Sequence, residues 1–188
     1  MTALRADIAR ACRDQRGGRL RRLALGLVAP GTQAVIVYRF GSWALSQPAV
    51  VRPVLDAAYH LLYFAVRMLW GIEISRHASI GPGLYICHFG GITVSRSAVI
   101  GRNCNLSQSI TIGFEGSGER CGAPVIGDDV YIAPGARLFG PIRIGDKVKI
   151  GANAVVYKDV PDGAVVALDP GFRILSYSGN RGGLELSK

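Results

Sequence analysis

Isoleucine, valine or leucine recurs every six residues through the C-terminal two thirds of the chain. These residues stand at positions 74, 80, 86, 94, 100, 106, 112, 126, 132, 138, 144, 150 and 156. Ten of the twelve steps are six residues long, and the other two are eight and fourteen. The fourth residue after each of these positions is also apolar, except at Gly90 and Gly116, which belong to the two repeats that end in the irregular steps. A period of six fits neither an α-helix nor simple strand alternation.

The hexapeptide period predicts a parallel β-helix, in which three hexapeptides make one triangular coil. The aliphatic residue of each hexapeptide points into the prism and stacks on its counterpart one coil away, at a spacing of about 4.8 Å. Glycine and asparagine tolerate the backbone angles that the corners demand. Thirteen repeats therefore give a little over four coils, and the frequent Gly and Pro residues exclude a helical interpretation of this region.

Residues 1–70 show helical spacing instead, for example at Leu4, Ile8 and Ala11. We therefore expect a mainly β protein with three parts: an α-helical N-terminal region over 1–70, a β-helix over 71–166, and a C-terminal tail over 167–188. The helices should cap the first coil, whose strand ends would otherwise be open. Because flat prism faces are buried by closed symmetric assembly, we expect a homotrimer, with a hexamer as the alternative.

The positive charge is concentrated in the helical region. Of the formal net charge of +9, residues 1–70 carry +7, from ten Arg and three acids. Such a field attracts nucleic acid, an anionic membrane or anionic ligands, but the region lacks the motifs of nucleic-acid binding, so we expect no nucleic-acid partner. The apolar segment 53–72 is interrupted by Asp56, His60 and Arg67, which disfavours a transmembrane helix. It is interpreted as a packed helix, and contact of residues 1–70 with a membrane surface is the alternative.

The four cysteines form no CxxC pair and nothing resembles a signal peptide, which favours a cytoplasmic protein with free thiols, soluble or peripheral at the inner face of the membrane. The chain has three His, none in the middle coils. A zinc site shared by three chains, as in a carbonic anhydrase prism, needs about three His per site, so we expect no metal.

Several motifs occur in a specific order: GIEISRHASIG, YICHFGGITVSRSAVIG, LSQSITIG, a Gly-rich excursion over 113–125, and VIGDDVYIAPGARLFGPIRIGDKVKIGANAVVYKDVP. This order resembles the hexapeptide-repeat acyltransferases, in particular the serine O-acetyltransferase branch. The resemblance implies a left-handed parallel β-helix behind an α-helical region. It also implies transfer of an acetyl group from acetyl-CoA to a hydroxyl.

His88 lies inside the eight-residue step, and the resemblance implies that it is the general base that removes the hydroxyl proton. Imidazole suits this role because its unperturbed pKa lies near neutral pH. Glu73 stands where the family has an aspartate paired with that histidine. Its carboxylate would orient the ring, as in a catalytic triad. His60 and His77 have no such context.

The sequence departs from the serine branch at the residues that the resemblance assigns to the acceptor. Cys87 replaces an aspartate, Ser95 replaces an acid in the next strand, and Arg120-Cys121 replaces an Arg-His pair. Since two carboxylates that would hold a desolvated ammonium are missing, we expect a neutral hydroxyl of a carbohydrate or exopolysaccharide precursor as the acceptor. HFGGI also resembles polysaccharide-associated members. The alternative is a serine O-acetyltransferase of cysteine biosynthesis, which the C-terminal LELSK weakly disfavours.

In the family the excursion closes over the site, and Arg120 is our candidate for contact with an anionic group. The resemblance places acetyl-CoA in a groove between neighbouring prisms. Backbone amides of Ala133, Gly151 and Ala152 would hold the pantetheine arm, and Lys158 would meet the 3′-phosphate. The usual GxPA ending is replaced by ALDPGFR over 167–173.

Overall fold

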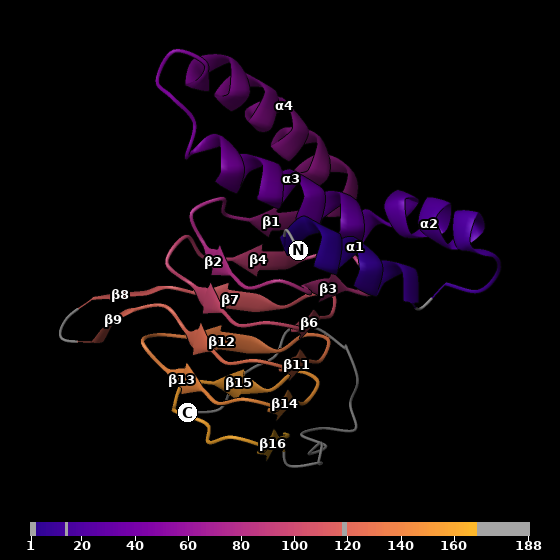
Figure 1. Cartoon of the computed structure of the whole chain (residues 1–188). Helices are drawn as coiled ribbons and strands as arrows, with labels where there is room; N and C mark the ends of the chain where they lie inside the picture. Colours follow the sequence, from indigo (N-terminus) through magenta and orange to yellow (C-terminus); the bar gives the residue numbers. More distant parts are fainter. Residues whose placement is uncertain (1–2, 14, 118–119, 169–188) are drawn as a thin grey trace, which may run out of the picture.

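The computed structural model describes residues 3–13, 15–117 and 120–168. Four helices come first in the chain, and short strands follow: α1 (Ala3–Arg13), α2 (Arg19–Val28), α3 (Pro30–Ala44) and α4 (Arg52–Trp70). Figure 1 shows the helices gathered at one end of a stack of coils. The segments LELSK and 169–173, to which the sequence analysis referred, lie outside the described residues.

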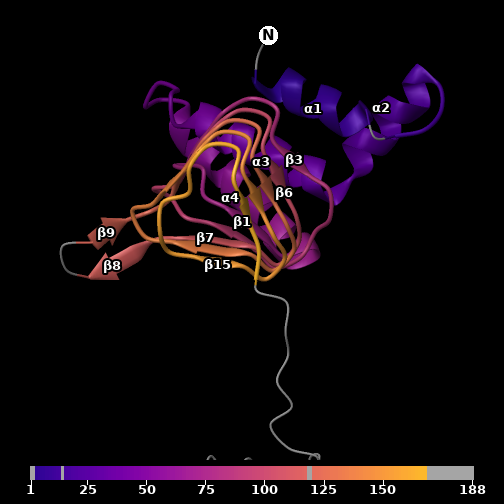
Figure 2. The ribbon, with the colours of Figure 1, turned by 90° about the horizontal axis from the view of Figure 1, so that it is seen from below.

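Three parallel sheets form the walls of a prism, which Figure 2 shows nearly end-on. The first sheet contains β1 (Ile72–Ile74), β4 (Ile92–Val94), β7 (Thr111–Gly113), β12 (Arg137–Phe139) and β15 (Val155–Val156). The second contains β2 (Ser79–Ile80), β5 (Val99–Ile100), β10 (Val125–Ile126) and β13 (Arg143–Ile144). The third contains β3 (Tyr85–Ile86), β6 (Asn105–Leu106), β11 (Tyr131–Ile132), β14 (Lys149–Ile150) and β16 (Val165–Val166). An antiparallel hairpin of β8 (Glu115–Ser117) and β9 (Arg120–Gly122) projects from the prism.

All thirteen periodic aliphatic residues are buried, with exposed fractions of 8% or less. They stack in columns, as the pairs Ile74 with Val94 and Ile112 with Leu138 show. The parallel β-helix predicted from the period is confirmed, and so is the left-handed form that the resemblance implied. The first and third sheets have five strands and the second has four. In the first sheet the fifth strand, β15, carries the thirteenth periodic residue, in agreement with the expected little over four coils, and in the third sheet β16 adds a strand beyond the periodic residues.

The extra residues of the two irregular steps loop out of the prism, and the register of the columns is unchanged. Positions 74 and 94 pair although they are twenty residues apart, two more than a coil of eighteen. Positions 112 and 138 pair at twenty-six, eight more than a coil. The extra residues therefore form the loop at 87–91 and the excursion that contains β8 and β9.

One edge of the prism is held by a ladder of aspartates. Asp128 Oδ1 accepts a hydrogen bond from the Arg102 amide at 2.7 Å, and Asp146 Oδ1 accepts one from the Asp128 amide at 2.7 Å. Asp162 Oδ1 accepts one from the Asp146 amide at 2.9 Å. Each carboxylate thus satisfies a corner amide of the preceding coil, which a turning backbone would otherwise leave to water.

The first coil is capped by a buried ion pair between Asp7 of α1 and Arg39 of α3. Arg39 Nε lies 2.8 Å from Asp7 Oδ2, and the Asp7 side chain is 2% exposed. Asp7 Oδ1 also accepts the amides of Gly83 and Leu84 at 2.7 and 2.8 Å. Arg39 donates to the carbonyls of Ile80 and Gly81, each at 2.6 Å. The expected capping of the open strand end is therefore achieved by one carboxylate and one guanidinium.

Replacing Arg39→Ala should lower the free energy of unfolding by about 3–5 kcal/mol, because Asp7 is left buried without its counter-charge. Urea unfolding followed by circular dichroism, at matched protein concentration, measures the change. The exposed Arg21→Ala is the control, and we expect it to stay within about 0.5 kcal/mol of the parent. Similar losses in both variants would contradict the capping role.

Candidate functional site

The residues expected to form the site fall on the two edges of the first sheet. The upstream edge, where the chain turns from the third sheet into the first, comprises the loops 87–91, 107–110, 133–136 and 151–154. His88 and the candidate acetyl-CoA residues Ala133, Gly151 and Ala152 all lie on this edge. The loops are joined from coil to coil by backbone hydrogen bonds, such as the 2.7 Å bond from the Ser109 amide to the Gly90 carbonyl.

The loop that carries His88 is anchored to the helices. The ring of Phe89 packs edge-on against Trp70 at the end of α4, with 5.3 Å between centroids. Trp70 Nε1 donates to Gln33 of α3 at 3.1 Å. Gly90 and Gly91 have φ of 103° and 65°, which glycine adopts freely. His88 is thus exposed on a loop that is fixed at its base.

Glu73 lies in β1, opposite Thr93 of β4. Its Oε2 is 3.5 Å from Arg67 Nη2, and both side chains are about half exposed. Burial first, and the Glu73 charge second, raise the pKa of Tyr63 to about 12. Among the described residues no hydrogen bond joins Glu73 to His88, so its role as the histidine's partner stays a prediction.

The other candidate acceptor residues lie on the downstream edge, where the chain leaves the first sheet. Ser95 directly follows β4, and its amide donates to the Ile112 carbonyl at 2.8 Å. Arg120 belongs to β9, but its side chain lies outside what the structure describes. Cys87, beside His88, is on the upstream edge. The three-residue strand β4, roughly 10 Å long, separates the two groups within one chain.

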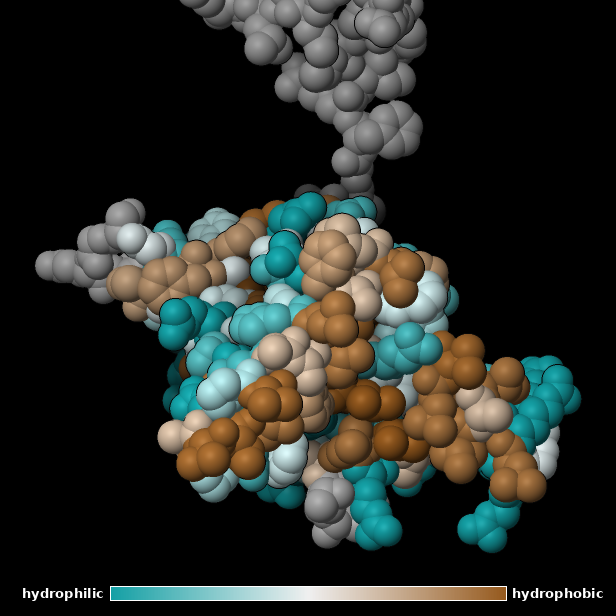
Figure 3. All heavy atoms as spheres, turned by 90° about the horizontal axis from the view of Figure 1, so that it is seen from above, coloured by the Kyte–Doolittle hydropathy of each residue, from teal (hydrophilic) through white to brown (hydrophobic). Residues whose placement is uncertain are grey.

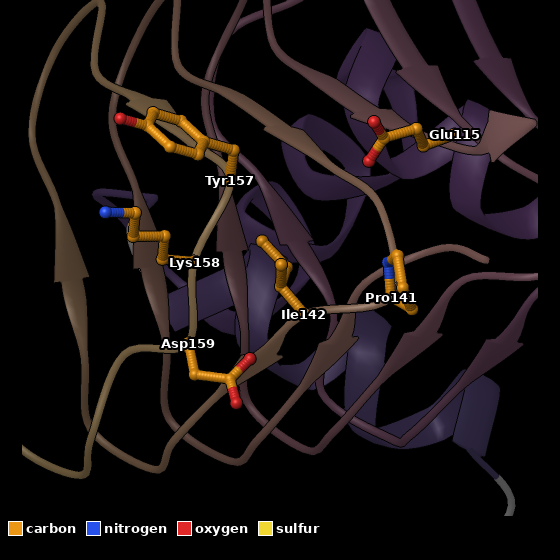
Figure 4. Close-up of a pocket in the computed structure, with 6 residues that line it drawn as sticks. All are labelled: Glu115, Pro141, Ile142, Tyr157, Lys158 and Asp159. Atoms are coloured by element: carbon orange, nitrogen blue, oxygen red, sulfur yellow. The ribbon is translucent and has the colours of Figure 1, made fainter. Parts of the chain in front are cut away.

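A groove of about 440 Å³ runs along the downstream edge. Figure 4 shows the side chains that line it: Glu115, Pro141, Ile142, Tyr157, Lys158 and Asp159. Lys158 Nζ lies 5.5 Å from the centroid of the Tyr157 ring. Lys158 is therefore in a groove, as a phosphate-binding residue should be, but on the opposite edge from Ala133. The sequence analysis did not single out Glu115 or Tyr157, and only the excursion itself pointed to Glu115.

Two of the three candidate amides for acetyl-CoA are already engaged. The Ala133 amide donates to the Ile150 carbonyl at 2.9 Å, and the Gly151 amide donates to the Val166 carbonyl at 2.6 Å. The Ala152 amide has no such bond within the part of the chain that the structure describes, so of the three it is the candidate to donate to a ligand. The hydrogen bonds of the Ala133 and Gly151 amides are part of the pairing between coils. The sequence motif alone did not indicate that these amides are engaged.

Gln108 is a further polar residue on the upstream edge that the sequence analysis missed. It follows Leu106 by two residues, as His88 follows Ile86, and Leu106 pairs with Ile86 in the next coil. Its Oε1 atom is buried and has no hydrogen-bond partner in the described structure. A buried acceptor of this kind is costly unless something donates to it. Gln108 is therefore a polar residue of this edge, one coil below His88, whose acceptor is unsatisfied among the described residues.

No group of three or more His, Cys, Asp or Glu residues that could hold a metal ion occurs in residues 3–13, 15–117 and 120–168.

The thiols on the two edges should differ in reactivity from the thiol in the core. Burial raises the pKa of the Cys104 thiol to about 11, whereas Cys87 and Cys121 are exposed. Because the thiolate is the reactive form, an alkylating reagent at about pH 8 should modify Cys87 and Cys121 and leave Cys104 intact. Peptide mass spectrometry of the native and unfolded chain measures the pattern. Rapid labelling of Cys104 in the native chain would show that the coil opens.

Comparison with known proteins places this geometry in context. The family described as bacterial transferase hexapeptide (six repeats) matches residues 123–158. A serine acetyltransferase of Mycobacterium tuberculosis is 36% identical over 173 residues, covering 91% of this chain and 72% of the relative. One of Synechococcus elongatus is 36% identical over 157 residues, covering 82% of this chain. The chain spans 61% of the length of that relative.

Solved structures agree with this comparison. Serine acetyltransferase isoform 3 of Entamoeba histolytica, in complex with cysteine, has a TM-score of 0.74 at 25% identity, covering 93% of this chain and 60% of its own. The Neisseria gonorrhoeae enzyme in complex with serine has a TM-score of 0.71 at 28% identity, covering 88% and 65%.

These relatives overturn the prediction of a carbohydrate or exopolysaccharide acceptor, because each of them is a serine acetyltransferase. The prediction treated the two missing carboxylates as the only groups that could hold an ammonium. The structure has Cys87 and Ser95 on opposite edges of the first sheet, so the two positions do not form one ammonium site within a single chain. Their side chains are therefore weak grounds for excluding serine.

Proposed function

The chain belongs to the hexapeptide-repeat acyltransferases, in the serine acetyltransferase branch, and on that premise we propose that it transfers an acetyl group from acetyl-CoA to the hydroxyl of L-serine. The reaction is the one that supplies O-acetylserine to cysteine biosynthesis. The observation that carries the proposal is the position of His88, exposed on a fixed loop at the head of the edge that holds Gln108 and Ala152. The matches to serine acetyltransferases over most of the chain support it.

In the proposed reaction His88 accepts the proton of the serine hydroxyl as the oxygen attacks the thioester carbonyl. The new carbon–oxygen bond forms, the carbon–sulfur bond breaks, and the departing thiolate of CoA takes the proton from the imidazolium. Imidazole suits both transfers because it is neutral and charged in comparable amounts near neutral pH. The loop holds the ring at the surface of the prism, where a second substrate can reach it.

The complete site requires two chains. His88 and Cys87 lie on the upstream edge, whereas Ser95, the excursion and Lys158 lie on the downstream edge of the same sheet. In a cyclic trimer the upstream edge of one prism faces a neighbour, so the downstream edge of that neighbour can complete the site. The split of the candidate residues between two edges supports this assembly, and a single chain would leave each half of the site open to water.

Acetyl-CoA fits the groove between two such edges. The His88 loop enters β4 in the second layer, and Lys158 follows β15 in the fifth. Three coil spacings separate these layers, or roughly 14 Å along the prism. A long ligand can therefore place its thioester at His88 and its 3′-phosphate near Lys158. Ala152 is the candidate to donate its amide hydrogen to a carbonyl of the pantetheine arm.

Replacing His88→Ala should lower kcat by about 10²–10⁴-fold and leave the KM for acetyl-CoA nearly unchanged, because a proton acceptor is lost and the groove is kept. The assay follows the ultraviolet absorbance of the thioester with L-serine as acceptor. A thiol-trapping reagent is avoided, since Cys87 and Cys121 are exposed.

His60→Ala is the matched control, because His60 is also exposed but lies on α4. It should retain the parent kcat. Absence of serine-dependent turnover in the parent chain would contradict the proposed acceptor, and full activity of His88→Ala would contradict the assignment of the base.

Replacing Glu73→Gln should lower kcat at least tenfold with little change in either KM, because the imidazolium loses a carboxylate that orients and stabilises it. Arg67→Ala separates this role from the ion pair that the structure shows. If Glu73 acts on His88, Arg67→Ala keeps most of the activity. Equal losses in both variants would indicate that the ion pair only supports the fold.

A further inference from the structure

The outward face of α4 is apolar although it is largely exposed in the described chain. The helix packs on its neighbours through Tyr59 and Val66, which are 3% and 7% exposed. On the opposite side six large apolar residues are exposed by 45% to 73%: Val54, Leu61, Leu62, Phe64, Met68 and Leu69. At 3.6 residues per turn these positions cover an arc of roughly 160°. A helix that is apolar on both sides is typical of one that is covered on both sides.

The same apolar surface continues over neighbouring parts of the helical cap. Leu20 and Val28 of α2 are 84% and 68% exposed, and Val50 before α4 is 89% exposed. Figure 3 shows the apolar residues gathered over the helices when the molecule is viewed from above. A contiguous apolar surface of this kind marks a site of interaction on a soluble fold.

The surroundings of this surface are strongly basic. Residues 1–70 hold ten Arg against three acids. Two of those acids are already paired, since Asp7 is buried against Arg39 and Asp56 Oδ1 is 2.5 Å from Arg76 Nη1. The third acid, Asp14, lies outside the described residues. In the described part of the cap, Asp7 and Asp56 are thus already paired, and neither balances the arginines of α2 and its flanks. The occupant of the apolar surface should therefore carry negative charge.

The helices do not form an evident transmembrane span. No single helix in the described part of the chain is long and apolar enough to cross a bilayer. Together α2 and α3, which are bent by 72° relative to each other, have the length and composition of a broken span. However, eight residues of α3 are buried against the rest of the protein, so α3 is not available to lipid.

We propose that the helical cap docks on the surface of an anionic phospholipid bilayer through the outward faces of α4 and α2. The apolar side chains enter the boundary between headgroups and acyl chains, and the arginines bind lipid phosphates. A second copy of the chain fits less well, because two caps placed face to face would bring like charges together. The proposal is independent of the acetyl transfer proposed above.

Vesicle sedimentation with the full chain tests this docking. The chain should sediment with vesicles of phosphatidylcholine and phosphatidylglycerol, bind pure phosphatidylcholine vesicles much more weakly, and be released by raised salt. Leu61→Asp should lower the partition coefficient about tenfold or more, because a charge replaces an inserted side chain. Val165→Asp is the matched control. Both parent residues are 71% exposed, and Val165 lies in β16, at the far end of the prism.

Thermal unfolding followed by circular dichroism establishes that both variants are folded. Failure of the parent chain to bind the anionic vesicles would overturn the proposal, as would equal loss of binding in the two variants. Analytical ultracentrifugation gives the remaining outcome. Leu61→Asp could halve the mass of the assembly while the parent chain does not bind vesicles. In that case the surface joins two copies of the chain, and the membrane proposal is wrong.

Discussion

The buried ion pair between Asp7 and Arg39 is the interaction on which the arrangement of this chain depends. A stack of parallel coils satisfies its own backbone everywhere except at its ends. At the first coil, one carboxylate accepts hydrogen bonds from two amides, and one guanidinium donates hydrogen bonds to two carbonyls. These bonds fix α1 and α3 on the prism. Gln33 of α3 accepts a hydrogen bond from Trp70, and the Trp70 ring packs against Phe89. The helices are thereby connected to the loop that carries His88.

The sequence was most informative where structure repeats locally. A period of six residues requires each aliphatic side chain to point inward, so the core could be predicted residue by residue, and the skipped step at 86–94 marked the loop of His88. It was silent on contacts between distant segments. In the sequence Asp7 resembles an exposed acidic residue of a helix, because its partner Arg39 is thirty-two residues away. The pairing of Glu73 with Arg67, and the use of the Ala133 and Gly151 amides within the sheets, depend in the same way on how helices and coils meet.

The acceptor was mispredicted because the missing carboxylates were treated as the only groups that could hold the ammonium of serine. Cys87 and Ser95 lie on opposite edges of the first sheet, so in the proposed assembly each faces groups of a neighbouring chain. The sequence of one chain does not show which groups a neighbour supplies. The relatives that match most of the chain changed the interpretation.

The looped-out steps have a consequence for how such a protein diversifies. The columns of Ile74, Val94, Ile112 and Leu138 remain in register although two and eight extra residues interrupt them. Chain length at these corners is therefore uncoupled from the folding of the scaffold. Insertions or deletions at 87–91 or 113–125 can therefore reshape the substrate pocket, in evolution or by engineering. The buried aliphatic columns, on which thermal stability depends, stay unchanged.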